Sequence, residues 1–117
     1  MYYKTKLGKK GEELAIQYLQ EHNYKIIDKN FRTRLGEIDI IAKDKQELVF
    51  IEVKTRTSNQ YGSPSEAVDN IKIKHIEKAA EYYIYIKQLQ NEYIRFDVIE
   101  VMADNGKYKI NHIKQIL

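Results

Sequence analysis

The sequence predicts a single α/β domain, residues 1–117, in which a mixed β-sheet is flanked by two helices. Two segments carry apolar residues at helical spacing, and five segments are rich in β-branched and aromatic residues. Together they give the order α-β-β-β-α-β-β. Three strands in succession can form a meander, and the strand after the second helix can join it in parallel through a right-handed crossover.

The first half of the chain predicts one helix and three strands. The helix covers residues 5–22 and ends near His22-Asn23, and its apolar side chains recur every three or four residues: Leu7, Leu14, Ala15, Tyr18 and Leu19. Strands follow at residues 24–34, 37–43 and 47–56. The short polar segment 44–47 joins the last two strands as a hairpin turn.

The second half predicts a long helix and a final hairpin. Ser63-Pro64-Ser65-Glu66 has the signature of a helix start, because serine caps, proline suits the first turn and glutamate completes a capping box. The helix extends to about residue 89, with one apolar stripe: Ala67, Val68, Ile71, Ile76, Ala79, Ala80, Tyr83 and Ile86. Residues 93–102 and 107–117 are strands joined by Asp104-Asn105-Gly106, since Asn-Gly suits positive φ angles.

Composition excludes several classes of protein. The chain has 117 residues and no cysteine, so it can form one core without disulfides and has no thiolate ligands for zinc. No apolar run approaches the roughly 20 residues of a membrane span. The first residues also lack the apolar segment of a signal peptide. We therefore expect a cytoplasmic protein outside the membrane.

The charge is weakly basic, with a net charge of +3. Its distribution says more than its sum, because the cations gather in clusters that could contact phosphates. Solvated surface lysines are the alternative for each of them taken alone. The clusters are Lys4, Lys6, Lys9 and Lys10; Lys25, Lys29, Arg32 and Arg34; and Arg56, Lys72, Lys74 and Lys78.

Charged residues lie inside two predicted strands, where they are normally depleted. Asp39 stands between two isoleucines, and Glu52 and Lys54 bracket Val53. Because side chains alternate between the faces of a strand, Glu52 and Lys54 point to one face and Val53 to the other. The charges of Asp39 on one strand, and of Glu52 and Lys54 on the next, therefore require compensation.

The hairpin register brings these charges together. A turn centred on Lys45-Gln46 predicts that Asp39 lies opposite Glu52, and Glu37 opposite Lys54. Like charges opposite one another destabilise a sheet. A divalent cation removes that conflict, and Mg²⁺ is typically held by one or two carboxylates together with waters and phosphate oxygens.

Two other interpretations of these charges stay open. Glu37 and Lys54 could form an ordinary cross-strand ion pair, and Asp39 and Glu52 could lie on a solvated face. For an isolated Glu-x-Lys in a strand, such interpretations are favoured. The additional aspartate within the isoleucine run of the neighbouring strand favours a site instead.

With this order and these residues in place, the chain resembles the PD-(D/E)xK nucleases. Their core is α-β-β-β-α-β, with an acid on the second strand and (D/E)-x-K on the third, here Asp39 and Glu52-Val53-Lys54. More closely, it is similar to the YraN-like family of small bacterial proteins. The matching segments are GKKGEELA (8–15), NFR (30–32), GEIDIIA (36–42), FIEVKTR (50–56), YG (61–62) and RFDV (95–98).

The resemblance implies a restriction-endonuclease-like core with an extra C-terminal strand, and a set of site residues. Asp39 and Glu52 would hold Mg²⁺ or Mn²⁺ with help from the Val53 carbonyl, and Lys54 would position or activate the attacking water. Glu12 on the first helix matches a glutamate that often completes the site in Holliday junction resolvases, and Glu13 is the fallback. The proline before the first acid of the superfamily motif is Ile38 here.

The expected activity is Mg²⁺-dependent hydrolysis of phosphodiester bonds in DNA, with branched DNA as a candidate substrate by analogy with resolvases. Because such enzymes often cut two strands as dimers, a homodimer is an option. A nuclease fold that binds nucleic acid without cutting it, or one that docks a protein, is the alternative. The residues expected to contact nucleic acid are Lys9, Lys10, Arg32, Arg34, Arg56 and Lys72.

Overall fold

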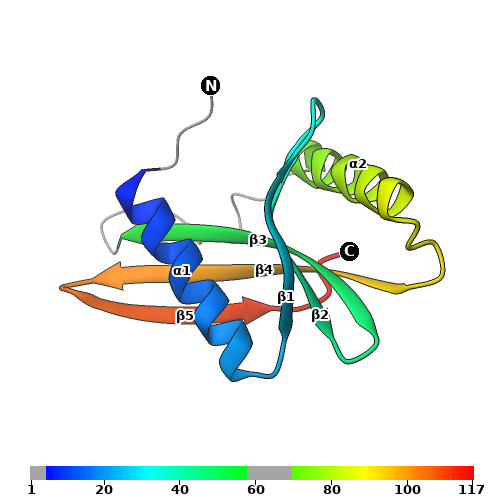
Figure 1. The fold of residues 1–117 in the computed structure, drawn as a ribbon. Helices are drawn as coiled ribbons and strands as arrows, with labels where there is room; N and C mark the ends of the chain where they lie inside the picture. The colour runs from blue at the N-terminus through cyan, green and yellow to red at the C-terminus, as the bar shows by residue number, and fades with distance from the viewer. Residues whose placement is uncertain (1–4, 58–69) are drawn as a thin grey trace.

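A five-stranded mixed sheet with one helix on each face forms the fold (Figure 1). The computed structural model describes residues 5–57 and 70–117. Its elements are α1 (Lys6–Glu21), β1 (Lys25–Arg32), β2 (Glu37–Asp44), β3 (Glu47–Thr57), α2 (Asn70–Lys87), β4 (Tyr93–Asp104) and β5 (Lys107–Ile113). The strands lie side by side in chain order, and only β3 and β4 run parallel. The predicted α/β class, mixed sheet and additional last strand are confirmed.

Alternation along the central strands builds two cores. Val49 and Ile51 of β3 pack beneath α1, whereas Leu48 and Phe50 of the same strand pack beneath α2. Glu52 and Lys54 continue the α2-facing series, and Val53 packs against the core under α1. The predicted division of these three side chains between the two faces is therefore confirmed.

Most predicted element boundaries are within two residues of the observed ones. The Asn105-Gly106 turn is confirmed, with φ angles of 49° and 77°. The predicted apolar stripe of the second helix is wrong at Ile71 and Ile86, which are 67% and 42% exposed. The two residues turn away from the sheet that buries Ile76, Ala79, Ala80 and Tyr83. The predicted helix start at Ser63-Pro64-Ser65-Glu66, with Ala67 and Val68, lies outside the described residues.

The sheet opens where β2 and β3 separate. The predicted register is confirmed from Asp44↔Glu47 to Ile40↔Ile51, where the pairing ends. The predicted pairing of Glu37 with Lys54 is wrong. Glu37 pairs with Arg32 of β1 instead, and their side chains are 3.5 Å apart. The start of β2 stays with β1, while β3 continues along β4 to Thr57↔Ala103. Asp39 and Glu52 therefore lie just beyond the last pair of the hairpin.

No helix within residues 5–57 and 70–117 is long and apolar enough to cross a membrane.

Candidate functional site

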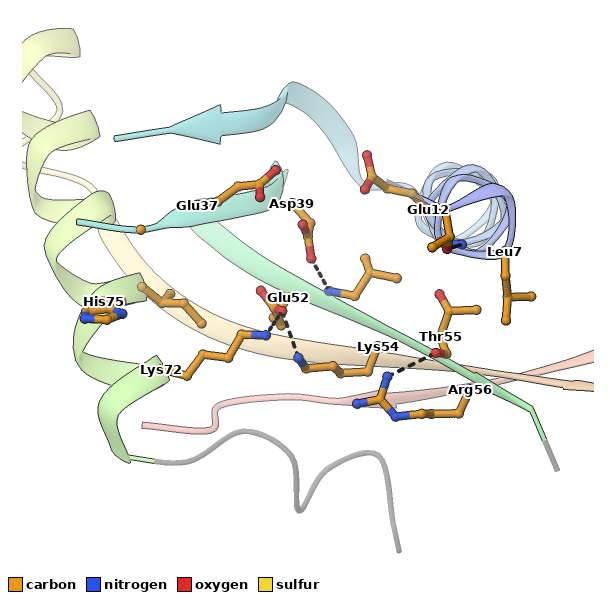
Figure 2. A pocket seen from close by; sticks show the side chains of 15 residues that line it. Leu7, Glu12, Glu37, Asp39, Glu52, Lys54, Thr55, Arg56, Lys72 and His75 are labelled. Atoms are coloured by element: carbon orange, nitrogen blue, oxygen red, sulfur yellow. Dashed lines mark hydrogen bonds and ion pairs between the residues drawn. The ribbon is translucent and has the colours of Figure 1, made fainter. Parts of the chain in front are cut away.

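A hollow of about 490 Å³ lies where β2 and β3 separate (Figure 2). Its walls come from both helices and both strands. The helix α1 contributes Leu7 and Glu12, and α2 contributes Lys72, His75 and Ile76. The strands contribute Glu37, Asp39, Glu52, Val53, Lys54, Thr55 and Arg56. The fold thus gathers the four predicted catalytic residues, Glu12, Asp39, Glu52 and Lys54, around one cavity.

Three buried carboxylates line the hollow, Glu12, Asp39 and Glu52, and the last two come from the neighbouring strands β2 and β3. Asp39 is 6% exposed and Glu52 is 8% exposed. One oxygen of Asp39, Oδ2, accepts a hydrogen bond of 2.8 Å from the backbone N–H of Val53, which fixes the acid against β3. Burial raises the pKa of Glu52, and the charge of Asp39 raises it further. The charge of Asp39 thus opposes the ionisation of Glu52, in the direction of the predicted repulsion between the two acids.

Two lysines meet the same oxygen of Glu52. Lys72 Nζ lies 2.7 Å and Lys54 Nζ 3.3 Å from Glu52 Oε1 (Figure 2). Burial lowers the pKa of Lys54, and its neighbour Lys72 lowers it further. Burial also opposes the charge of Lys72, but the Glu52 carboxylate outweighs it and raises the pKa of Lys72. The two ammonium groups are therefore unequal, and Lys72 holds its proton more firmly.

Two glycines allow the helices to come this close. A Cβ at Gly11 would overlap Oγ1 of Thr55, so only glycine lets α1 lie against β3 at this point. A Cβ at Gly36 would lie 2.7 Å from the backbone oxygen of His75 on α2. The close approach of α1 brings Glu12 to the hollow, whereas the adjacent Glu13 is exposed and lines no part of it.

The predicted phosphate-contacting residues divide into three groups. Arg56 and Lys72 line the hollow, and Arg56 donates to the Thr55 carbonyl at 3.1 Å. Arg32 and Arg34 line a second hollow, together with Lys78 and Tyr82 of α2. Lys9 and Lys10 are exposed on α1 and line neither. The six residues therefore do not all line one hollow.

The residues of the hollow that could bind an oxygen-preferring divalent cation are Asp39 and Glu52. In the part of the chain that the structure describes, no three His, Cys, Asp or Glu side chains gather closely enough to hold a metal by themselves. Asp39 and Glu52 supply two carboxylates, which is the number that Mg²⁺ commonly takes from a protein while it keeps waters and phosphate oxygens. No thiolate is present, and carboxylates suit Mg²⁺ or Mn²⁺.

A second polar cluster lies under α1 and was not foreseen. Arg95 donates to Asp97, Asp44, Glu47 and the hydroxyl of Tyr24. His112 Nε2 lies 2.7 Å from Asp97 Oδ2, and its Nδ1 lies 3.1 Å from the hydroxyl of Tyr18. None of Arg95, Asp97 and His112 lines either hollow. The buried polar groups of this cluster are hydrogen-bonded to one another, and these bonds connect α1, β4 and β5. We therefore interpret the cluster as structural.

Comparison with known proteins places the chain among close relatives. A family model described as "Uncharacterised protein family UPF0102" matches residues 11–101. A UPF0102 protein of Clostridium botulinum (strain Kyoto) is 52% identical over 97% of this chain and 96% of the relative. UPF0102 proteins of Caldicellulosiruptor bescii and Clostridium perfringens are 51% and 46% identical, over 92% and 96% of this chain and 93% of each relative.

Proposed function

We propose that this chain, which belongs to the uncharacterised protein family UPF0102, is a metal-dependent nuclease that hydrolyses phosphodiester bonds in DNA. The observation that carries the proposal is the pair of buried carboxylates, Asp39 and Glu52, which shares one hollow with Lys54 and Lys72. Ionised carboxylates are rarely buried without a counter-charge, and perturbed groups of this kind concentrate at functional sites. DNA with a branched structure is a candidate substrate.

The fold supports placement among the PD-(D/E)xK nucleases. The order α1-β1-β2-β3-α2-β4 matches their core, and β5 is the additional strand. Asp39 lies on the second strand, and Glu52 and Lys54 on the third. The parallel pairing of β3 with β4 and the crossover through α2 bring Lys72 back over the end of β3.

Each residue has a separate task in this proposal. Asp39 and Glu52 would hold a divalent cation, which would supply a water of lowered pKa and offset the negative charge of the phosphate. Lys54 orients the attacking water and faces the charge that develops on the phosphate. Lys72 holds Glu52 in place and keeps its own positive charge in the hollow. Glu12, at the opposite wall, completes the set of acidic residues around the hollow.

A cleavage assay tests this function and separates it from its alternative. Purified protein is incubated with single-stranded DNA, linear duplex and a four-way junction, each with Mg²⁺, Mn²⁺ or EDTA. Cutting that requires metal and disappears in Glu52→Ala and Lys54→Ala supports the nuclease. Binding without cutting in any metal contradicts it and supports a nucleic-acid-binding module. The absence of both cutting and binding also contradicts it and points to a protein-docking scaffold.

Thermal unfolding gives a prediction that does not depend on activity. Because the charge of Asp39 opposes the ionisation of Glu52, Asp39→Asn should raise the Tm of the metal-free protein. A ligand that binds only the folded state stabilises it. Mn²⁺ should therefore raise the Tm of the wild type but not of Asp39→Asn. A lower Tm for the metal-free variant, or an equal Mn²⁺ effect on both proteins, contradicts the acid-pair argument.

A further inference from the structure

A second hollow, about 830 Å³ in volume, lies between α2 and the loop that joins β1 to β2. Its lining is Arg32, Thr33, Arg34, Leu35, Lys78 and Tyr82. Three of these six side chains are cations and none is an acid. The nuclease proposal leaves this surface without a role.

Two of the three cations, Arg34 and Lys78, are available to a ligand, whereas Arg32 is paired with Glu37. Arg34 is exposed and has no ion pair among residues 5–57 and 70–117. Lys78 lies 3.7 Å from Glu81, but both side chains are at least 60% exposed, and exposed pairs of this kind contribute little. A ligand with phosphate groups can therefore replace the solvent and the weak partner at little cost.

The apolar part of the hollow offers an aromatic face. Tyr82 is 52% exposed, and its ring stacks on Phe31 with centroids 6.3 Å apart and an interplanar angle of 28°. Leu35, 56% exposed, belongs to the same lining. An exposed ring supported from behind, with cations around it, is the combination by which proteins bind unpaired nucleic acid: bases stack and phosphates meet the cations.

The second hollow continues the first along one helix. Lys72 and His75 face the acidic hollow, and Lys78 and Tyr82 face the basic one. The loop between the hollows rests on α2, where Gly36 meets the backbone of His75. From Lys72 to Tyr82 the helix rises about 15 Å at 1.5 Å per residue. That length corresponds to roughly four base-pair steps of a duplex at 3.4 Å each.

We propose that the second hollow binds an unpaired segment of a nucleic acid strand, with one base stacked on Tyr82 and phosphates against Arg34 and Lys78. The choice of nucleic acid as the ligand rests on the proposed function. The inference adds a substrate class to it: the strand is unpaired roughly four nucleotides from the bond at the acidic hollow. A fully paired linear duplex cannot offer a base to Tyr82 and is the weaker ligand.

Binding assays in EDTA test the subsite without cleavage. A short labelled single strand and a duplex of equal length are titrated by fluorescence anisotropy. Tyr82→Ala should weaken binding of the single strand about 10-fold, the effect of one lost stack, and leave the duplex unchanged. Tyr82→Phe should bind like the wild type, because it keeps the ring. Arg34→Ala should reduce the slope of log affinity against log salt by about 0.7.

Matched controls come from the same helix. Tyr85 and Lys74 are exposed on α2 and line neither hollow. Tyr85→Ala and Lys74→Ala should bind like the wild type. Equal losses in Tyr85→Ala and Tyr82→Ala overturn the proposal. Competition by polyglutamate as strong as that by a single strand of equal charge also overturns it, because the surface would then recognise charge alone, as in an acidic peptide.

The outcomes for the two proposals are separable. If the wild type cuts DNA but Tyr82→Ala and Arg34→Ala bind and cut like it, the subsite is wrong and the nuclease stands. If Tyr82→Ala lowers single-strand affinity in a protein that cuts nothing with any metal, the subsite stands and the nuclease proposal fails.

Discussion

Replacement of Lys54 by methionine is expected to slow metal-dependent cleavage by about 10²–10³-fold, the usual cost of removing one group that faces transition-state charge. Lys54 has a side chain that is only 11% exposed and a Nζ atom 3.3 Å from Glu52 Oε1. Methionine preserves the length and packing of the aliphatic chain but removes the positive charge. Affinities for Mn²⁺ and for DNA should change only a few-fold, because the two carboxylates remain.

Single-turnover cleavage rates and Mn²⁺ titrations of the same protein separate these effects. Lys72→Met is the matched comparison, since Lys72 meets the same oxygen of Glu52. We expect a smaller loss in rate there, because Lys72 comes from α2 and acts through Glu52. Lys74→Met, on the exposed side of α2, removes the same charge and should leave the rate unchanged. A fully active Lys54→Met beside an inactive Lys72→Met would reverse the roles assigned to the two lysines.

The central part of the site could be predicted from the sequence because its geometry is local. The turn at Lys45-Gln46 fixes the register of β2 and β3, and two-residue alternation places Glu52 and Lys54 on one face. These two rules brought Asp39, Glu52 and Lys54 together without a structure. Glu12 could be predicted only from the family resemblance. Local sequence patterns do not reveal that Gly11 of α1 lies against Thr55 of β3 and so brings Glu12 to the hollow.

The remainder of the site depends on long-range placement. The sequence predicts that Lys72 contacts nucleic acid, but it does not reveal that the crossover through α2 places this lysine on Glu52. The separation of β2 from β3 beyond Ile40↔Ile51 was not foreseen, because the hairpin rule extends a register without saying where it stops. The buried pair Arg95 and Asp97 did carry a signal. The two residues stand two apart in an apolar strand, as Glu52 and Lys54 do.

Replacement of Asp97 by asparagine is expected to cost about 3–5 kcal/mol of folding free energy at neutral pH, as removal of one member of a buried ion pair usually does. Asp97 is 1% exposed and accepts hydrogen bonds from Arg95 Nε at 2.9 Å and from the backbone N–H of Gln115 at 3.1 Å. The amide NH₂ of asparagine would face hydrogen-bond donors, Arg95 and the Gln115 N–H, that now meet a carboxylate oxygen. The buried charge of Arg95 would also lose the negative charge of Asp97 beside it. Urea unfolding measures the loss, and Asp104→Asn, exposed at the end of the same strand, is the control of equal charge.

The pH dependence identifies the source of that energy. Burial alone would raise the pKa of Asp97, but hydrogen bonds from His112 and Arg95 outweigh it and lower the pKa. A carboxyl whose pKa is lowered by folding contributes stability above its unfolded pKa of about 3.9, and loses it as the pH falls further. The wild type should therefore lose stability below about pH 4 and approach Asp97→Asn. A stability difference between the two proteins that stays constant from pH 7 to pH 3 would contradict this origin.

Because Asp97 lines neither hollow, the variant should still bind Mn²⁺ below its own Tm, which separates a structural role from a catalytic one.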